Sequence, residues 1–464
     1  MSKKMKVVVI GAGSADFGQG AVADWLIAGR MKEFDINMVL VDIDQEALDR
    51  MYKFSKVLKD YYKSNMKIEA IMDRSVALPG ANYVITAVSR RRWDLWQKDF
   101  FIPAAYGFRQ VFGENGGPGG CFHTLRSLNL MVPIAKDMEK YCPDALLLNY
   151  TNPESRVCLA VSKLTKIRNV GLCHGPMETL GILSEILEMP EDDIEMTAAG
   201  INHFHWVLRI KNKKTGQDLY PILDEKLKTY KWDPADPLSA VLYDLFGLFP
   251  FPAPTHPDEY MNFAKDIGGP GFIYWGIGQI SRNLNAKWDD LNYIIEGISN
   301  RPSYELWSNH QVERINKVLS GELPLSDKDL LLKKDLTEPS RELAIPIIYG
   351  IEFNLNNREI GANVMNKGQA ISNLREDMIV EVPIIINSEG IHPEKVGPLP
   401  SAIAGMCSIQ SYIQDLLVEA YAKKSKKALL QAILLDPFVD DISRAKKMME
   451  TMLKLEEEFL PELK

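Results

Sequence analysis

The feature that most constrains the fold is a buried strand that leads directly into a glycine turn near the N-terminus. Four apolar residues, Val7 to Ile10, precede the tetrapeptide GAGS at residues 11–14, and a helical pattern follows from about Gln19 to Ala28. A continuous apolar run is typical of a strand that is covered on both sides of a parallel sheet. A second such run, Met38 to Val41, is closed by Asp42. The sequence therefore predicts a strand–helix–strand unit within a parallel sheet.

Further strands and helices alternate along the first 200 residues. The predicted strands are Tyr83 to Val88, Ala145 to Asn149 and Asn169 to Leu172, and the predicted helices are Gln45 to Tyr62, Leu125 to Lys140 and Glu154 to Leu164. This alternation predicts an α/β fold: a Rossmann-type doubly wound parallel sheet with right-handed crossovers. We expect this domain to occupy residues 1–200.

The pattern changes after about residue 200. Trp206 to Ile210, the turn at Lys213 to Gly216, and Leu219-Tyr220 together predict an antiparallel hairpin. A strand near Met378 to Ile386 and amphipathic helices near Ile409 to Ala422 and Ile442 to Phe459 follow. We expect residues 201–464 to form a mixed α+β domain that serves substrate binding, metal binding and oligomerisation, an architecture like that of lactate and malate dehydrogenases.

The glycine turn predicts a dinucleotide site at Gly11, Gly13 and Ser14. Glycine lets a backbone approach a pyrophosphate, and the helix N-terminus offers free N–H groups. Asp42, at the end of the second strand, can accept hydrogen bonds from ribose hydroxyls and would repel a 2′-phosphate, which favours NAD over NADP. The third glycine of the usual pattern is replaced by Asp16, and Gly18 follows two residues later. A glycine turn in an unrelated α/β fold is the alternative.

Composition excludes several other classes of protein. The 464 residues carry 54 Lys and Arg against 62 Asp and Glu, a net charge of −8, which does not favour a nucleic-acid partner. No apolar run reaches the roughly 20 residues that span a membrane, and no apolar signal segment follows the N-terminal lysines. Five scattered cysteines do not form a disulfide framework. We therefore expect a cytoplasmic protein with neither a membrane nor a nucleic-acid partner.

Three polar motifs fall where strands of the predicted sheet end. They are NYTNP at residues 149–153, GLCHG at 171–175 and GINHF at 200–204, and a glycine-rich loop, GENGGPGG, lies at 113–120. Ligands of open α/β sheets bind outside the carboxyl ends of the strands, so these segments can converge on one cleft. Cys173 and His203 offer a thiolate and an imidazole, which suit a transition metal. On spacing alone a Cys and a His thirty residues apart are more often unrelated, and His174 and His205 could be structural histidines.

These motifs together resemble the family 4 glycoside hydrolases. The resemblance rests on GAGS, GENGGPGG, NYTNP, GLCHG, GINHF and the later NVMNKGQ at residues 363–369, and it extends from the first strand to about Pro400. Members of this family depend on NAD, unlike glycoside hydrolases that use two carboxylates. The resemblance implies a glycosidase that uses NAD and Mn²⁺ or a similar divalent ion, and a homodimer or homotetramer.

The resemblance also implies roles for individual residues. Cys173 and His203 match the metal ligands, Asn152 and Asn202 would hold substrate hydroxyls, and Glu114 matches an acidic residue near the catalytic centre. The branch that acts on phosphorylated sugars usually carries Asp after the metal-binding cysteine. His174 stands there, as in the branch that resembles α-galactosidases, α-glucosidases and uronidases. We therefore expect His174 to be the general acid and the substrate to be a non-phosphorylated, α-linked glycoside.

Two assignments stay open. The family base, an Asp or Tyr, falls on Pro254, which cannot accept a proton, so Asp258 and Tyr260 are the candidate bases. Arg90 to Arg92 could recognise an anionic sugar such as a uronide; they could equally form a solvated loop or contact the pyrophosphate.

The implied reaction begins with oxidation of the sugar at C3, which makes the C2 proton acidic. Removal of that proton expels the glycosidic oxygen from C1, water adds at C1, and C3 is reduced again. The alternative is an NAD-dependent 2-hydroxy acid dehydrogenase of the malate or lactate type, which needs no metal. A non-catalytic NAD-binding regulator is a weaker alternative.

Overall fold

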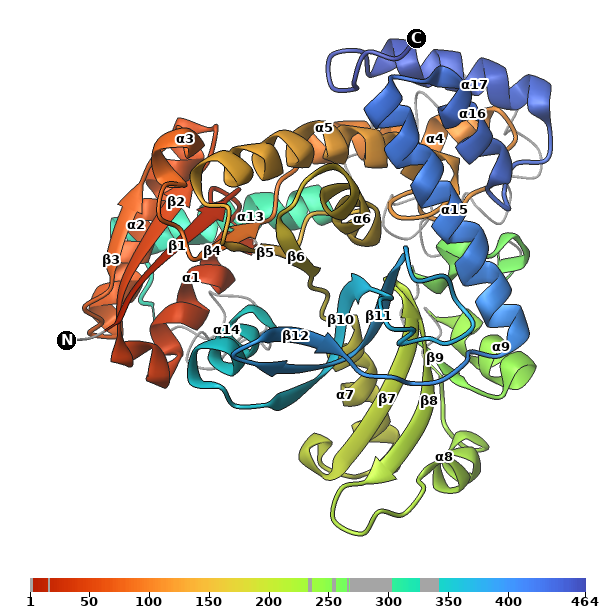
Figure 1. Cartoon of the computed structure of the whole chain (residues 1–464), viewed down its shortest axis with the longest axis horizontal. Coiled ribbons are helices and arrows are strands. Elements are labelled where there is room, and N and C mark those ends of the chain that lie inside the picture. The colour runs from red at the N-terminus through yellow and green to blue at the C-terminus, as the bar shows by residue number, and fades with distance from the viewer. Residues whose placement is uncertain are drawn as a thin grey trace.

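A computed structural model describes residues 3–15, 17–232, 236–252, 256–264, 267, 303–325 and 342–464. Figure 1 shows these residues as two adjoining halves, with the N-terminal strands and helices in one and a second group of strands in the other. Within these ranges no helix is long and apolar enough to cross a membrane.

Six parallel strands form the first half of the sheet, in the order β3-β2-β1-β4-β5-β6. They are β1 (Lys3–Ile10), β2 (Phe34–Val41), β3 (Lys67–Ala70), β4 (Tyr83–Thr86), β5 (Leu146–Asn149) and β6 (Arg168–Gly171). The helices of this half are α1 (Phe17–Ile27), α2 (Gln45–Tyr61), α3 (Arg74–Ala77), α4 (Arg92–Ala105), α5 (Gly117–Tyr141), α6 (Glu154–Leu164) and α7 (Gly175–Leu187). The strand order reverses direction next to β1, which is the place where ligands bind in such sheets.

The sheet continues into the second half through antiparallel strands, in the order β6-β10-β11-β7-β8-β9. These are β7 (Ile194–Ile201), β8 (Phe204–Asn212), β9 (Phe249–Pro250), β10 (Asn357–Met365), β11 (Ile379–Asn387) and β12 (Gly390–Pro393), which pairs with β11. The helices are α8 (Tyr220–Leu227), α9 (Pro237–Phe246), α13 (Ser303–Ser320), α14 (Ala344–Phe353), α15 (Ser401–Lys423), α16 (Lys426–Leu435) and α17 (Ile442–Leu455), and the short η3 helix spans Pro257–Tyr260.

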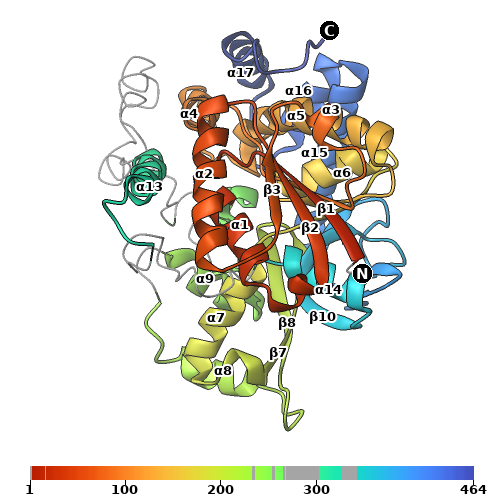
Figure 2. The ribbon, with the colours of Figure 1, turned by 90° about the vertical axis from the view of Figure 1, so that its left-hand side faces the viewer.

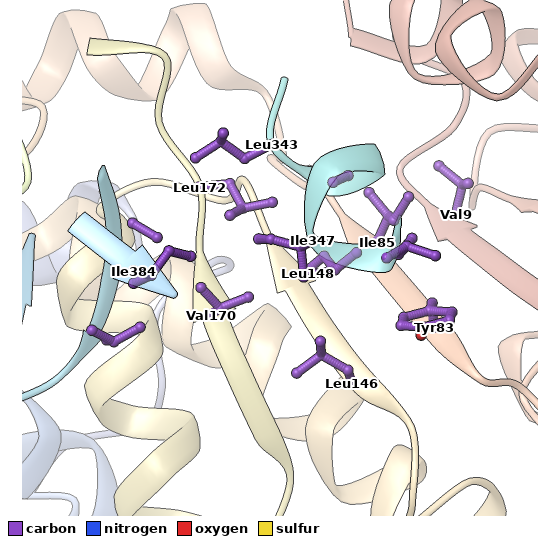
Figure 3. Close-up of a cluster of buried hydrophobic side chains, with 14 of the residues drawn as sticks. Val9, Tyr83, Ile85, Leu146, Leu148, Val170, Leu172, Leu343, Ile347 and Ile384 are labelled. Carbon is purple, nitrogen blue, oxygen red and sulfur yellow. The ribbon is translucent and has the colours of Figure 1, made fainter. Parts of the chain in front are cut away.

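Helices cover both faces of the parallel strands, which explains the continuous apolar runs. Val7 and Val9 join one buried cluster with residues of α1 and α2, whereas Val8 and Ile10 join another with residues of α5 and α6. Figure 2 shows α1 and α2 on one side of β1 to β3 and α5 and α6 on the other. Figure 3 shows how Leu343 and Ile347, at the start of α14, meet Leu148 and Leu172 in the first cluster.

The predicted fold class is confirmed: a Rossmann-type parallel sheet followed by a mixed α+β half. The division of the chain at residue 200 falls at the end of β7, inside one continuous sheet, and stays a prediction.

The predicted hairpin is wrong in its second arm. β8 pairs along its length with β7, and the predicted second arm is only a short return in which Leu219 donates its N–H to the carbonyl oxygen of Ile210 at 2.9 Å before Tyr220 begins α8. Only a single bridge, Lys211 with Asp218, forms beyond the turn at Lys213 to Gly216.

Candidate active site

The turn after β1 brings the chain backbone close to its neighbours. Gly11 has a φ of +89°, and a Cβ there would lie 2.1 Å from the carbonyl oxygen of Ala87. The N–H groups of Gly11 and Ala12 both donate to the carbonyl oxygen of Val41, at 2.9 and 3.1 Å. Glycine is therefore required at position 11 both by conformation and by space.

Asp42 is tied to the same turn. One carboxylate oxygen accepts the N–H of Gly13 at 2.8 Å and the other accepts the N–H of Asp44 at 3.0 Å. A Cβ at Gly13 would approach the Asp42 carboxylate to 2.8 Å. The acid that the sequence assigns to the ribose is thus held next to the glycine turn.

Gly18 takes the place of the third glycine. A Cβ at this position would lie 2.4 Å from the carbonyl oxygen of Ala12, so α1 can approach the turn only with glycine here. The spacing differs from the usual pattern, but Gly18 serves the close approach that the third glycine serves there.

A cleft of about 1150 Å³ contains most of the predicted site residues. Its lining includes Gly11, Gly13, Ser14 and Asp42 from the dinucleotide turn, and Glu114, Asn152, Cys173, His174 and His203 from the polar motifs. These residues come from the ends of β1, β2, β5, β6 and β7 and from the loop before α5. The expectation that the separate motifs converge on one cleft is met.

The two predicted metal ligands are not charged in their surroundings. Burial, and next the nearby carboxylates of Glu381 and Glu154, raise the pKa of the Cys173 thiol well above its usual value. Burial lowers the pKa of His203 well below its usual value, so its ring is neutral near pH 7. A neutral imidazole and a thiol that a cation would help to ionise are the forms in which these groups accept a transition metal.

Carboxylates lie next to His203. Within the described ranges, ligand atoms of Glu114, His203 and Glu259 lie within 4.8 Å of one another. Glu114 is paired with Arg92 at 3.2 Å and accepts from Nδ2 of Asn152 at 3.5 Å. Burial raises the pKa of Glu114 despite Arg92, and burial together with Glu114 raises that of Glu259. This cluster of buried acids favours a cation.

Three predicted residues do not line the cleft. Asp258 is buried, and its pKa is raised by burial and by Asp236. Tyr260 is buried and donates its hydroxyl hydrogen to the carbonyl oxygen of Asn202 at 3.1 Å. Asn202 is buried, and its side chain lies within hydrogen-bonding reach of the Cys173 thiol, whose pKa it lowers against the larger effect of burial. Pro254, where the family base falls, lies outside the described residues.

His174 and the arginines stand at the exposed side of the cleft. His174 precedes α7, with Nε2 at 3.2 Å from a Glu178 carboxylate oxygen. Arg91 pairs with Asp94 at 2.8 Å, and Arg92 pairs with Glu114. Arg90 lines the cleft and has no ion pair within the described ranges.

Three residues of the site escaped the sequence analysis. Asn115 lies next to His203, with Nδ2 at 2.9 Å from Nδ1. The His256 ring centroid lies 3.9 Å from that of His203, and burial lowers the pKa of His256 to about 4. The third is Glu259. The glycine-rich loop could have drawn attention to Asn115, but no pattern in the sequence signals His256 or Glu259.

The fold and the cleft define a Rossmann-type enzyme with a dinucleotide turn and a polar cluster in a shared site. One family model, described as family 4 glycosyl hydrolase, matches residues 6–189, and another, described as family 4 glycosyl hydrolase C-terminal domain, matches residues 198–439. The chain therefore belongs to the family 4 glycosyl hydrolases, and it is a glycosidase.

Curated relatives cover nearly the whole chain. An α-galactosidase of Bacillus subtilis (strain 168) is 33% identical over 435 residues, 93% of each protein. An α-glucosidase of Erwinia rhapontici is 29% identical and covers 99% of each. A maltose-6′-phosphate glucosidase of Bacillus subtilis (strain 168) is 27% identical, over 100% of this chain and 98% of the relative.

Solved structures share the fold. A 6-phospho-α-glucosidase from gut microorganisms, in complex with NAD and Mn²⁺, has a TM-score of 0.78 at 22% identity and covers 100% of both chains. A 6-phospho-β-glucosidase from Thermotoga maritima, with manganese, NAD⁺ and glucose-6-phosphate, has a TM-score of 0.76 at 21% identity, over 99% of this chain and 100% of the other. A malate dehydrogenase of Picrophilus torridus is similar in fold alone, with a TM-score of 0.51 at 12% identity over 90% of this chain and 99% of the other. Because the family models match glycosidases, the dehydrogenase alternative is not retained.

Proposed function

We propose that this glycosidase uses NAD and a divalent metal ion, Mn²⁺ or a similar ion, to cleave a non-phosphorylated α-glycoside such as an α-galactoside, an α-glucoside or a uronide. One observation carries the proposal: the dinucleotide turn at Gly11, Gly13 and Asp42 and the donors Cys173 and His203 line the same cleft. Similar proteins were solved with NAD and manganese, which agrees with both parts of the proposal.

The cofactor and the metal supply chemistry that side chains lack. The turn at Gly11, Gly13 and Asp42 would hold NAD, which would supply a hydride acceptor and donor for C3 of the sugar. Cys173 and His203 would hold the metal, which would supply Lewis-acid chemistry toward sugar oxygens. Both donors suit such an ion, because one is a soft sulfur ligand and the other a neutral imidazole.

The protein positions the sugar and moves protons. Asn152, which lines the cleft, holds a sugar hydroxyl through its amide, and Glu114 is the carboxylate next to Asn152. The family resemblance gives Asn202 the same role, but in this structure it is buried outside the cleft lining. His174 gives a proton to the leaving glycosidic oxygen, because it stands at the exposed side of the cleft next to Glu178. Asp258 or Tyr260 removes the C2 proton. Both are buried and lie outside the cleft lining in this structure.

His174 also supports a sugar without phosphate. The position after the metal-binding cysteine carries a histidine in this chain, where the branch that acts on phosphorylated sugars usually carries an aspartate. The α-galactosidase and the α-glucosidase are more similar to this chain than the maltose-6′-phosphate glucosidase, at 33% and 29% against 27% identity.

The decisive experiment combines cofactor dependence with the fate of the C2 proton. A panel of nitrophenyl glycosides and uronides should be hydrolysed only with NAD, Mn²⁺ and a thiol reductant, with no net formation of NADH. In D₂O the released sugar should carry deuterium at C2, because elimination must break the C2–H bond whereas displacement never does. Full activity of protein freed of NAD and metal, or product without C2 label and without a C2 isotope effect, would refute the proposal.

We also propose that the protein is a cytoplasmic homodimer or homotetramer. All five cysteines are free thiols, which agrees with a reducing compartment. Light scattering coupled to size-exclusion chromatography tests the assembly, and a monomer at micromolar concentration would contradict it.

A further inference from the structure

His203 is held in an unusual way. Its φ of +64° is rare for a residue with a side chain, so the surrounding structure must enforce it. Its ring is buried, with 4% of the residue exposed, and Nδ1 has Nδ2 of Asn115 at 2.9 Å. A metal-binding histidine uses one ring nitrogen for the metal, while the partner of the other nitrogen fixes the orientation of the ring and the position of its proton.

We propose that Asn115 is a positioning residue that fixes the ring of His203 for the metal, and that Glu259 holds Asn115 in place. This inference rests on the proposed role of His203 as a metal ligand. It adds two residues for which the family resemblance implied no role.

Asn115 has the chemistry for this task. An amide carries an oxygen acceptor and a nitrogen donor of similar shape. It can therefore hydrogen-bond to Nδ1 of His203 whether or not that nitrogen carries a proton. In the structure Nδ2 of Asn115 faces Nδ1 and also donates to Oε2 of Glu114 at 3.5 Å. When Nε2 is the metal-binding atom, Nδ1 carries the hydrogen, so metal binding requires the Asn115 amide to turn and present its oxygen as the acceptor. Asn115 is itself 3% exposed, so water cannot replace the amide in this task.

Glu259 connects the loop of Asn115 to the second half of the molecule. One carboxylate oxygen of Glu259 accepts the N–H groups of both Asn115 and Gly116, each at 2.5 Å. The backbones also touch: a Cβ at Gly116 would lie 2.2 Å from the carbonyl oxygen of Glu259. The η3 helix, the loop before α5 and His203 therefore form one chain of contacts, Glu259 to Asn115 to His203.

The test measures Mn²⁺ binding rather than activity. The wild type and an Asn115→Leu variant are freed of metal with a chelator and titrated with Mn²⁺ alone, and NAD affinity is measured in parallel. We expect Mn²⁺ affinity to fall about 10- to 100-fold in Asn115→Leu, with unchanged NAD affinity. Asn169→Leu is the matched control, because it loses amide hydrogen bonds to Ser162 Oγ at 2.9 Å and to the carbonyl oxygen of Ile167 at 3.4 Å, at a site outside the cleft lining.

Glu259 variants test the second step. Glu259→Gln keeps an oxygen acceptor for both N–H groups and should retain most of the Mn²⁺ affinity, whereas Glu259→Leu should lose it. If Glu259 acts through Asn115, the double variant Asn115→Leu/Glu259→Leu should bind Mn²⁺ no more weakly than Asn115→Leu alone. Additive losses would overturn this step.

The possible failures can be told apart. Wild-type Mn²⁺ affinity in Asn115→Leu would overturn the positioning role, and so would an equal loss of NAD affinity, which indicates a general loss of structure. If the wild-type protein binds no Mn²⁺, or His203→Ala binds it equally well, the proposed metal site fails instead.

Discussion

Cys173 offers the most direct test at the scale of single residues. Burial and two nearby carboxylates raise the pKa of its thiol, so the thiol stays protonated near pH 7. A bound metal ion would favour the thiolate. Serine is a hard, poorly ionised ligand, and we expect Cys173→Ser to lose metal affinity about 10- to 100-fold, with a matching loss of hydrolysis. Metal content by mass spectrometry and the rate of hydrolysis measure both.

The control for this variant is Cys142→Ser, which changes a buried thiol at the end of α5 and outside the cleft lining. The metal content and the rate of hydrolysis of this control should stay near wild type. Equal metal occupancy in Cys173→Ser and the wild type would remove Cys173 from the metal site.

Arg90 tests the charge of the substrate. It lines the cleft without an ion pair in the described part of the chain, whereas Arg91 is paired with Asp94. If Arg90 binds a sugar carboxylate, Arg90→Ala should lower kcat/KM for the preferred uronide about tenfold, the equivalent of one charged hydrogen bond of about 1.5 kcal/mol. The matched neutral hexoside should be unaffected, and Arg91→Ala should change neither. A wild-type preference for the neutral hexoside would end the idea.

Single residues were predictable where chemistry is encoded locally. Gly11 and Asp42 each follow an apolar strand. Their places in the strand–turn–helix–strand unit were enough to assign them to the dinucleotide site. Glu259 was not predictable, because its partners Asn115 and Gly116 lie more than 140 positions earlier in the chain. A contact of that kind depends on the assembled fold.

At the scale of elements, α1 contains two glycines with opposite expected effects. Gly18 is pressed against the carbonyl oxygen of Ala12, whereas a Cβ at Gly20 would meet nothing within 4 Å. Gly18→Ala should therefore destabilise the protein by about 1–3 kcal/mol and weaken NAD binding, because it pushes α1 away from the turn. Gly20→Ala should stabilise it by about 0.5–1 kcal/mol through better helix propensity.

Urea denaturation and NAD titration of both variants provide the measurement. Equal effects of the two substitutions would show that Gly18 has no special role in the approach of α1 to the turn.

Elements with strong periodicity were predicted well, and elements with weak patterns were not. The predicted helices Gln45 to Tyr62 and Glu154 to Leu164 match α2 and α6 within one residue. β3 was missed because four residues, KIEA, are too short to show a period, and β7 because IEMTAAGI has small residues at its inner positions. The glycines at residues 116–120 are typical of a loop, so the first two turns of α5 were also missed.

At the scale of the whole molecule, strand pairing was the feature that local patterns could not supply. β10 and β11 lie between β6 and β7 in the sheet, although more than 150 residues separate β7 from β10 in the chain. Any strand with a buried face can serve as a partner, so the sequence indicates that a strand exists but not where it pairs. The predicted change of pattern near residue 200 corresponds to the change from parallel to antiparallel pairing in the sheet.

A buried triad of Arg126, Asp99 and Glu456 connects the C-terminal segment after α17 to α4 and α5. Arg126 of α5 binds Asp99 of α4 through two hydrogen bonds and also binds Glu456, which follows α17. Figure 1 shows α15, α16 and α17 gathered next to α4 and α5. One cation faces two buried carboxyls here, so one carboxyl should hold a proton. Burial and the nearby Asp99 raise the pKa of Glu456 to about 8.

This triad makes stability depend on pH in a defined direction. Between about pH 4.5 and pH 8, Glu456 is protonated in the folded protein and ionised in the unfolded chain. From about pH 6 to pH 8 the folded state then binds one proton more, so its free energy of unfolding falls as pH rises, by at most about 1.4 kcal/mol per pH unit. Burial raises the pKa of Asp99 to about 6, so Asp99 adds to this decline below about pH 6. Glu456→Gln imitates the protonated acid and should lack this decline. The difference in unfolding free energy between the variant and the wild type should therefore grow in favour of the variant from pH 5 to pH 8.

Arg126→Met, which leaves two buried carboxyls without a cation, should be severely destabilised. Urea denaturation at intervals of one pH unit measures all three proteins, and parallel pH profiles for Glu456→Gln and the wild type would show that both carboxyls are ionised in the fold.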